Sequence, residues 1–143
     1  MHHVAIMEKS RKLIPRILSG EKTIESRWYK VRVAPWNRIS AGDTVWFKDS
    51  AEPVTAVAEV ERVLFSENPS DDDLRDLLRT YGGSPGVCFQ HPEKMFDWCR
   101  GRRYIILMFL KNPRAVEPFH IDKTGFGNAC AWLTVEDIAT LKR

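Results

Sequence analysis

Gly20-Glu21-Lys22-Thr23-Ile24-Glu25-Ser26-Arg27 is the stretch of this 143-residue chain that decides the fold. The residues before it predict a helix, because apolar side chains recur at helical spacing over 13–18 and Gly20 suits the left-handed position that ends a helix. Ser10 is the expected N-cap of this helix. Thr23 to Tyr29 then alternates with a period of two, which predicts a strand with Glu25 and Arg27 on one face.

Three charged side chains of this stretch are expected to share one small volume. Residues two apart in a strand lie about 6.6 Å apart along it, and Lys22 at the turn can bend toward Glu25 and Arg27. A carboxylate beside two cations keeps its charge and can accept a hydrogen bond or orient water, whereas a lysine removed from solvent can exchange a proton. The alternative is an exposed ion pair that contributes about 0–1 kcal/mol and has no functional role.

The remaining elements predict an α+β fold. We expect further strands at 3–7, 44–48, 54–65 and 104–110, an edge strand at 115–121, and helices that start after Ser70, span 92–100 and close the chain at 134–141. Five to six strands, mostly antiparallel, and helices without a βαβ alternation favour a small barrel with helices packed against it. Residues 1–143 are expected to form a single domain.

Composition predicts a soluble, cytoplasmic protein. Hydrophobic residues make up 43% and charged residues 29%, which is ordinary for a globular chain. The apolar run 104–110 is far shorter than the roughly 20 residues of a membrane helix, so no membrane partner is expected. Three cysteines without a CxxC spacing predict free thiols, and the lone pair Cys88 and His91 is too weak a signal for zinc. No metal and no cofactor are predicted.

Basic residues are concentrated between Lys9 and Arg38, where nine lysines and arginines stand against two glutamates, although the net charge is only +3. The loop after the second strand combines Lys30, Arg32 and Arg38 with Trp36. Cations that follow phosphates and aromatic rings that stack bases are typical of single-stranded nucleic acid binding. Trp36 is the best single candidate for a stacking surface.

The central stretch resembles the signature of the ASCH domain family, G-x-K-x-x-E-x-R, in all four specified positions: Gly20, Lys22, Glu25 and Arg27. The sequence Ala-Gly-Asp-Thr-Val at 41–45 also resembles the family's entry into its next strand. The resemblance implies a PUA-like barrel with a cleft that Lys22, Glu25 and Arg27 line and whose entrance Gly20 shapes. It also implies binding of RNA or DNA, and some small bacterial members resemble amidohydrolases that deacetylate N4-acetylcytidine.

Three functional hypotheses follow. The first is nucleic-acid or nucleotide binding in a basic cleft, with RNA favoured. The second is hydrolysis of a modified nucleoside, with Lys22 as base or proton shuttle, Glu25 orienting it and Arg27 holding the substrate. The related enzymes carry threonine where this chain has Glu25, and they need a glutamate from the second half of the chain. The third hypothesis is a protein-interaction module, since basic segments also attract acidic proteins.

Overall fold

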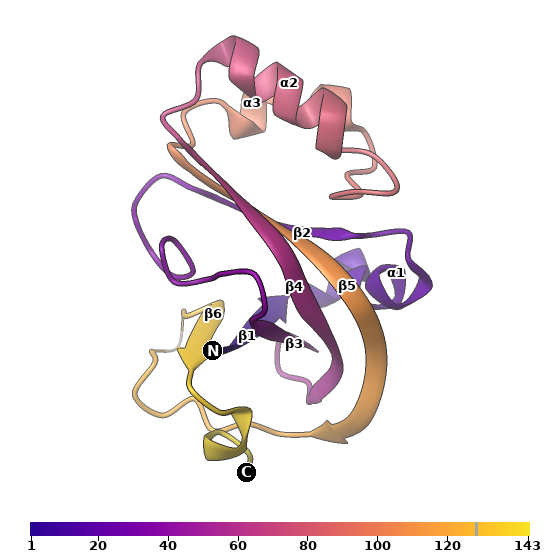
Figure 1. Cartoon of the computed structure of the whole chain (residues 1–143), viewed down its shortest axis with the longest axis vertical. Helices are drawn as coiled ribbons and strands as arrows, with labels where there is room; N and C mark the ends of the chain where they lie inside the picture. Colours follow the sequence, from indigo (N-terminus) through magenta and orange to yellow (C-terminus); the bar gives the residue numbers. More distant parts are fainter. Residues whose placement is uncertain (128) are drawn as a thin grey trace.

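Six strands form one strongly curled sheet in the computed structural model, which describes residues 1–127 and 129–143 (Figure 1). The strands are β1 (His2–Met7), β2 (Ile24–Tyr29), β3 (Thr44–Asp49), β4 (Val54–Glu67), β5 (Tyr104–Phe119) and β6 (Trp132–Val135). The helices are α1 (Leu13–Ser19), α2 (Asp71–Tyr81) and α3 (Phe96–Cys99), with short 3-10 turns η1 (Lys9–Arg11), η2 (Pro92–Lys94) and η3 (Ile138–Thr140). The predicted α+β architecture, a curled sheet with helices packed against it, is confirmed.

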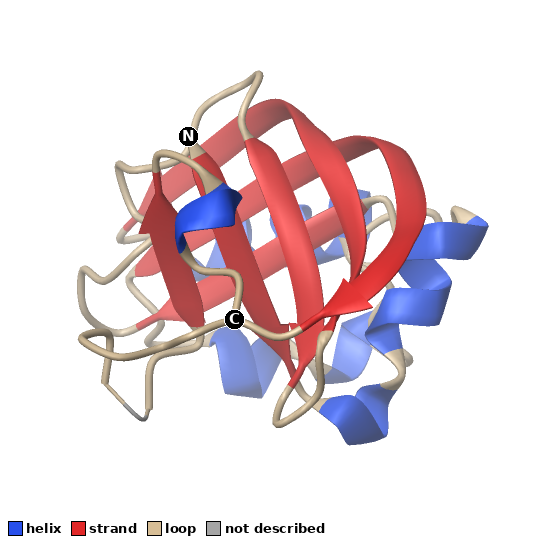
Figure 2. Ribbon diagram, turned by 90° about the horizontal axis from the view of Figure 1, so that it is seen from below, coloured by secondary structure: helices blue, strands red, loops and turns tan. Residues whose placement is uncertain are grey.

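The sheet is mixed and curls into a half-barrel (Figure 2). Its order is β2-β5-β4-β3-β1-β6, with β1 and β3 parallel and all other neighbours antiparallel. The curl brings the two edge strands toward each other. Arg27 of β2 accordingly donates a hydrogen bond to the Ala131 carbonyl, next to β6. The candidate site described below lies near this open seam.

Alternating side chains in the first half of β5 contribute to two different hydrophobic clusters. Ile106 and Met108 of β5 face the inside of the curl, where α1 packs, whereas Ile105 and Leu107 face the layer formed by α2 and α3. All four are fully buried. This alternation is what a strand buried on both faces requires. β2 is held in place by β5, with which it pairs along its whole length.

The separate edge strand predicted at 115–121 is wrong, because β5 runs without a break from Tyr104 to Phe119. Proline had suggested an interruption, but Pro113 and Pro118 both lie where the β4–β5 register shifts. The pairing passes from Lys111 and Glu59 to Arg114 and Val57, so Pro113 lies in a bulge. A bulge tolerates a residue that cannot donate a backbone hydrogen bond.

The closing helix predicted at 134–141 is also wrong. Thr134 pairs with His3 and Leu133 with Val4, so this segment forms β6 at the edge beside β1. The Leu133 side chain is buried in the core there, and the three-residue turn η3 follows the strand. The predicted N-cap Ser10 lies in η1 instead, and α1 begins at Leu13.

The other elements follow the sequence prediction closely. Gly20 ends α1 with φ +83°, and Ser70 caps α2 by accepting a hydrogen bond from the Asp73 backbone N–H at 3.1 Å. The helix predicted at 92–100 is split into η2 and α3. Within the described residues, no helix has the length and apolar character needed to span a bilayer.

Candidate functional site

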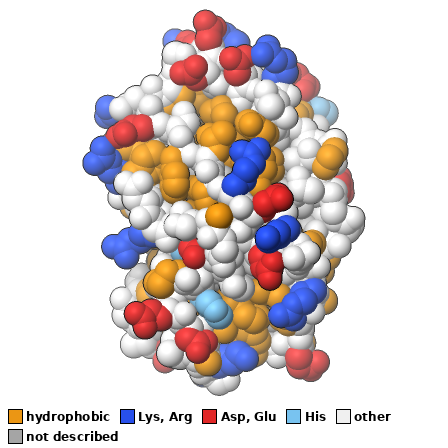
Figure 3. Space-filling model, viewed as in Figure 1, with side chains coloured by type: hydrophobic (Ala, Val, Ile, Leu, Met, Phe, Trp, Pro, Cys, Tyr) orange, Lys and Arg blue, Asp and Glu red, His pale blue; other side chains and the backbone are white. Residues whose placement is uncertain are grey.

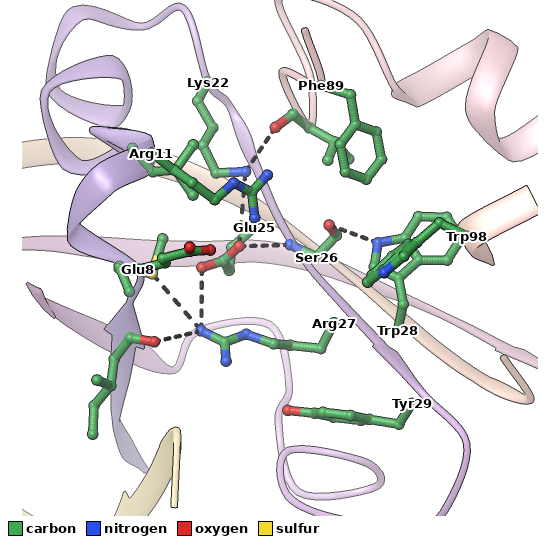
Figure 4. A pocket seen from close by; sticks show the side chains of 14 residues that line it. Glu8, Arg11, Lys22, Glu25, Ser26, Arg27, Trp28, Tyr29, Phe89 and Trp98 are labelled. Carbon is green, nitrogen blue, oxygen red and sulfur yellow. Dashed lines mark hydrogen bonds and ion pairs between the residues drawn. The ribbon is translucent and has the colours of Figure 1, made fainter. Parts of the chain in front are cut away.

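A pocket of about 280 Å³ opens beside β2, between the end of β1 and the segment that links α2 to α3 (Figure 4). This volume is just below the range of about 300–1,000 Å³ that ligand sites usually occupy. Charged and aromatic side chains dominate the lining: Glu8, Arg11, Lys22, Glu25, Arg27, Trp28, Tyr29, Phe89 and Trp98. The pocket therefore suits a small polar ligand with an aromatic part.

Lys22 is placed by two glycines. Gly20 turns the chain out of α1, and the Lys22 N–H then donates to the Arg16 carbonyl at 2.9 Å. Gly86 bridges to Lys22 and accepts hydrogen bonds from the N–H groups of Thr23 and Ile24. A Cβ on Gly86 would clash with the Tyr81 carbonyl oxygen, so no larger residue fits this crossing without a shift. The glycine run at 82–86 thus anchors the turn that carries Lys22.

The Lys22 side chain is almost completely buried, with 2% of it exposed. Its Nζ donates hydrogen bonds to the Val87 carbonyl at 2.7 Å and the Ile24 carbonyl at 2.8 Å, and lies 3.7 Å from Oε1 of Glu25. Burial lowers the pKa of Lys22, while the Glu25 carboxylate acts in the opposite direction. The ammonium group therefore links the start of β2 to the segment that contains Val87.

Glu25 carries a carboxylate oxygen with no hydrogen bond. Its Oε1 accepts from the Ser26 backbone N–H at 2.9 Å, which fixes the orientation of the carboxylate. Its Oε2 is buried and has no hydrogen-bond partner among the described residues, although Nη2 of Arg27 lies 3.5 Å away. Buried acceptors normally have a donor, so Oε2 of Glu25 is an exception whose charge is balanced by the nearby Arg27 guanidinium.

Arg27 spans the open seam of the half-barrel. Its guanidinium donates weakly to the Ile6 carbonyl at 3.4 Å and the Ala131 carbonyl at 3.5 Å, and its Cζ lies 5.1 Å from the centre of the Trp132 ring. The same group forms the ion pair with Glu25. Arg27 thus serves as a wall of the pocket and as a contact between β2 and the strands opposite.

The structure brings three of the predicted residues, Lys22, Glu25 and Arg27, into one pocket, and Gly20 turns the chain toward it. It does not bring the basic loop there: Lys30, Arg32, Trp36 and Arg38 are outside the lining. Trp36 packs edge-on against Phe65 and Tyr104 at centroid distances of 5.2 and 5.1 Å.

Ion pairs neutralise part of the basic segment outside the pocket. Arg32 is bound to Glu67 at 2.6 Å and Lys9 to Glu52 at 2.7 Å. The face shown in Figure 3 carries positive and negative side chains intermixed with apolar ones, not one continuous basic surface. The expected basic cleft is therefore confined to Arg11, Lys22 and Arg27.

Sequence reasoning missed several pocket residues, among them Glu8, Arg11, Phe89 and Trp98. Phe89 and Trp98 come from the segment after α2, more than 60 residues from Lys22, and no local pattern connects the two regions. Glu8 and Arg11 follow the end of β1. The available signal was that Arg11 belongs to the basic segment between Lys9 and Arg38.

The described residues contain no cluster of three or more histidine, cysteine, aspartate or glutamate side chains arranged to hold a metal ion. Cys88 lies near Glu21, with its Sγ 3.5 Å from Oε1, and not in a ligand set with His91. The three cysteines are free.

The chain combines a curled mixed sheet with a charged pocket beside its second strand, which defines it as a small half-barrel protein. Solved structures place the chain more closely. It is similar to the ASCH protein of Zymomonas mobilis, with a TM-score of 0.68 and 16% identity over 99% of this chain and 96% of that one. A tyrosine-to-phenylalanine mutant of the same protein gives a TM-score of 0.67 at 16% identity over 99% of both chains. The chain therefore has the ASCH fold, as its signature residues predicted.

Sequence comparison gives no such match: no family model fits the chain, and no curated protein is significantly similar to it. At this level of identity the structural similarity establishes the fold and leaves the ligand to be inferred from the site itself.

Proposed function

We propose that the chain binds single-stranded nucleic acid, RNA in preference to DNA, or a nucleotide, by accepting one base in the pocket beside Glu25. The observation that carries this proposal is the buried Oε2 of Glu25, which lacks a hydrogen-bond donor in the described structure. Cytosine, adenine and guanine present N–H groups on their edges, and a glutamate accepts hydrogen bonds from such groups. A base inserted here would satisfy the oxygen.

The walls of the pocket support the same ligand. Trp28 is held in place because its Nε1 donates to the Ser26 hydroxyl at 2.9 Å, and Phe89 and Trp98 complete an aromatic side. Aromatic rings bind bases by stacking, which contributes about 1–3 kcal/mol per base. Arg11 and Arg27 provide positive charge at the same pocket for a phosphate. The preference for RNA rests on the resemblance to the ASCH signature, and the free cysteines fit the cytoplasmic location that we also propose.

The test compares wild type with Glu25→Gln in fluorescence anisotropy titrations of short single-stranded RNAs and of nucleosides. Glutamine keeps the shape of the side chain but replaces one acceptor oxygen with a donor, so we expect affinity to fall about tenfold or more. Glu61→Gln, on the exposed side of β4, is the matched control. RNA affinity should also weaken between low and moderate salt. Equal binding by Glu25→Gln, or no binding of any nucleoside or RNA, would contradict the proposal.

A second candidate is hydrolysis of a modified nucleoside such as N4-acetylcytidine. It is favoured by the lowered pKa of Lys22, caused by burial, together with Glu25 at 3.7 Å. Lys22 would act as the base or proton shuttle, Glu25 would orient it, and Arg27 would hold the substrate. We rank this second because Nζ of Lys22 already donates to two carbonyls, and the second half of the chain contributes no acidic side chain to the pocket lining in the described part.

Incubation with N4-acetylcytidine separates the two candidates, because only a hydrolase releases cytidine and acetate. Unchanged substrate after long incubation would exclude this activity for that compound. Lys22→Ala adds a second criterion, since a binding protein should lose part of its affinity whereas an enzyme should lose nearly all turnover.

A further inference from the structure

A second hollow adjoins the Glu25 pocket. It measures about 470 Å³ and shares four lining residues with that pocket: Glu8, Arg11, Phe89 and Trp98. Beyond these four, Lys94 and Met95 of the segment before α3 extend it away from Glu25. Because one set of side chains borders both volumes, the two hollows lie side by side.

Free cations face this second hollow. Arg11 and Lys94 form no ion pair within the part of the chain that the structure describes, whereas Lys9 and Arg32 elsewhere in the basic segment are each bound to a glutamate. Arg11 stands at the border between the two hollows, and Lys94 lies only in the second. An unneutralised cation at each of these positions favours an anionic ligand with charges at two points along its length.

Trp98 gives the second hollow a fixed aromatic wall. Its side chain is 46% exposed, yet the Arg102 guanidinium covers one face at 4.4 Å and the Trp28 ring meets it edge-on at 6.4 Å. The next residue, Cys99, is completely buried and anchors α3 in the core. An exposed ring held on a rigid support offers a stacking surface that loses little entropy when a ligand binds.

We infer that the second hollow holds the nucleotide adjacent to the one in the Glu25 pocket, so that the site recognises a dinucleotide unit of a single strand. This inference rests on the proposed function. Trp98 stacks on the second base, Arg11 contacts the phosphodiester at the border, and Lys94 contacts the outer phosphate. Glu8, whose Oε1 accepts from the Ser10 hydroxyl at 3.2 Å, faces the same border and suits ribose hydroxyls, which donate to a carboxylate.

A larger hollow of about 630 Å³ between α2 and η2 is a weaker candidate for a nucleotide subsite. Its two arginines are already engaged, because Arg79 is paired with Asp76 and Arg75 is stacked on Phe96 at 4.3 Å and paired with Asp72 at 3.3 Å. It also shares none of its lining residues with the Glu25 pocket.

The experiment compares ribonucleosides with ribodinucleotides of the same base, phosphorylated at the 5′ or the 3′ end, by isothermal titration calorimetry. The readout is the ratio of the two dissociation constants for each base. We expect the better dinucleotide to bind about tenfold tighter than its nucleoside or more, because a second base stacks and a second subsite engages phosphate. Lys94→Gln and Trp98→Ala should each reduce this ratio toward one, and Lys111→Gln on the remote part of β5 should leave it unchanged.

The outcomes separate the inference from the proposal on which it rests. Nucleosides that bind as tightly as dinucleotides would overturn the second subsite and leave the base-binding pocket intact. A dinucleotide advantage that survives both Lys94→Gln and Trp98→Ala would overturn the placement in this hollow. If neither nucleosides nor dinucleotides bind, the proposed function fails and the second subsite fails with it.

Discussion

At the scale of single residues, the ammonium group of Lys22 holds the pocket together. It joins the start of β2 to the segment after the glycine run through the carbonyls of Ile24 and Val87. Those carbonyls are buried with it, so removing the cation leaves acceptors without a donor and Glu25 without one of its two charged neighbours.

Lys22→Met should therefore lower the free energy of unfolding by about 3 kcal/mol, because each buried acceptor that loses its donor costs about 1–3 kcal/mol. Urea titrations followed by circular dichroism measure this difference. Lys30→Met, at an exposed position, is the control and should change stability by less than about 0.5 kcal/mol. Equal stability of the two variants would show that the amino group has no structural role.

His3 makes the free energy of unfolding depend on pH. The residue is completely buried, its Nε2 lies 2.8 Å from Oδ2 of Asp43, and its Nδ1 accepts from Nε1 of Trp132 at 3.1 Å. Burial lowers the pKa of His3 below 6.5, so the unfolded chain takes up a proton at a higher pH than the folded protein does.

Stability should consequently fall as pH decreases from 7.5 through 6.5 toward the folded-state pKa of His3. Urea unfolding at a series of pH values between 7.5 and 5.5 measures the slope, and His3→Gln should flatten it. The carboxyl group of Asp43 does not titrate in this window. Burial raises its pKa, but the hydrogen bonds that it accepts from His3, the Ser40 N–H and the N-terminal amine outweigh burial and lower the pKa below 3.8. A wild-type slope as shallow as that of the variant would contradict the assignment.

The site itself could be predicted from sequence only in part, and the reason is visible in its residues. Lys22, Glu25 and Arg27 share one short segment, so strand geometry alone brought them together. Phe89 and Trp98 reach the pocket through the crossing at Gly86, a contact between segments more than 60 residues apart that no local spacing encodes.

At the scale of elements, the sequence predictions succeeded where a helix or strand carries its own start and stop residues. The N-terminus of α2 is the strongest case, because Ser70 and Asp73 form a reciprocal capping box. The elements that were mispredicted, β6 and the second half of β5, depend instead on partner strands. Thr134 has the sequence of a helix start, yet pairing with β1 overrides that preference.

Ser70→Ala should lower the free energy of unfolding by about 1 kcal/mol and the melting temperature by about 3 °C, because one N-terminal amide of α2 loses its acceptor. Thermal unfolding by circular dichroism measures the shift. Ser10→Ala is the matched control, since the Ser10 hydroxyl donates to Glu8 and caps no helix. A larger effect at Ser10 than at Ser70 would reverse the assignment of the cap.

At the scale of the whole molecule, the sheet curls without closing. β2 and β6 are its two edges, and the contacts of Arg27 with Ile6, Ala131 and Trp132 bridge the opening between them. The barrel shape was predictable from the number and order of strands, but the open seam was not, because it depends on how far the long β4–β5 pair bends at its register shifts.

Arg27→Lys should loosen this seam, because a lysine amine cannot stack on Trp132 and donate in two directions as the planar guanidinium does. We expect a loss of about 1 kcal/mol in unfolding free energy and faster amide hydrogen exchange in β6, with little change in the central strand β4. Arg38→Lys in the exposed loop is the control. Unaltered exchange in β6 would mean that its pairing with β1 alone holds that edge.

The double engagement of Arg27 also affects how ligands of this protein should be sought. A compound that draws the guanidinium toward itself must detach it from the carbonyls across the seam, so part of the binding energy is offset by a looser scaffold. Screens that score ligands by the rise in melting temperature will then rank such compounds too low. Calorimetry or equilibrium dialysis, which detect occupancy directly, are the better first assays.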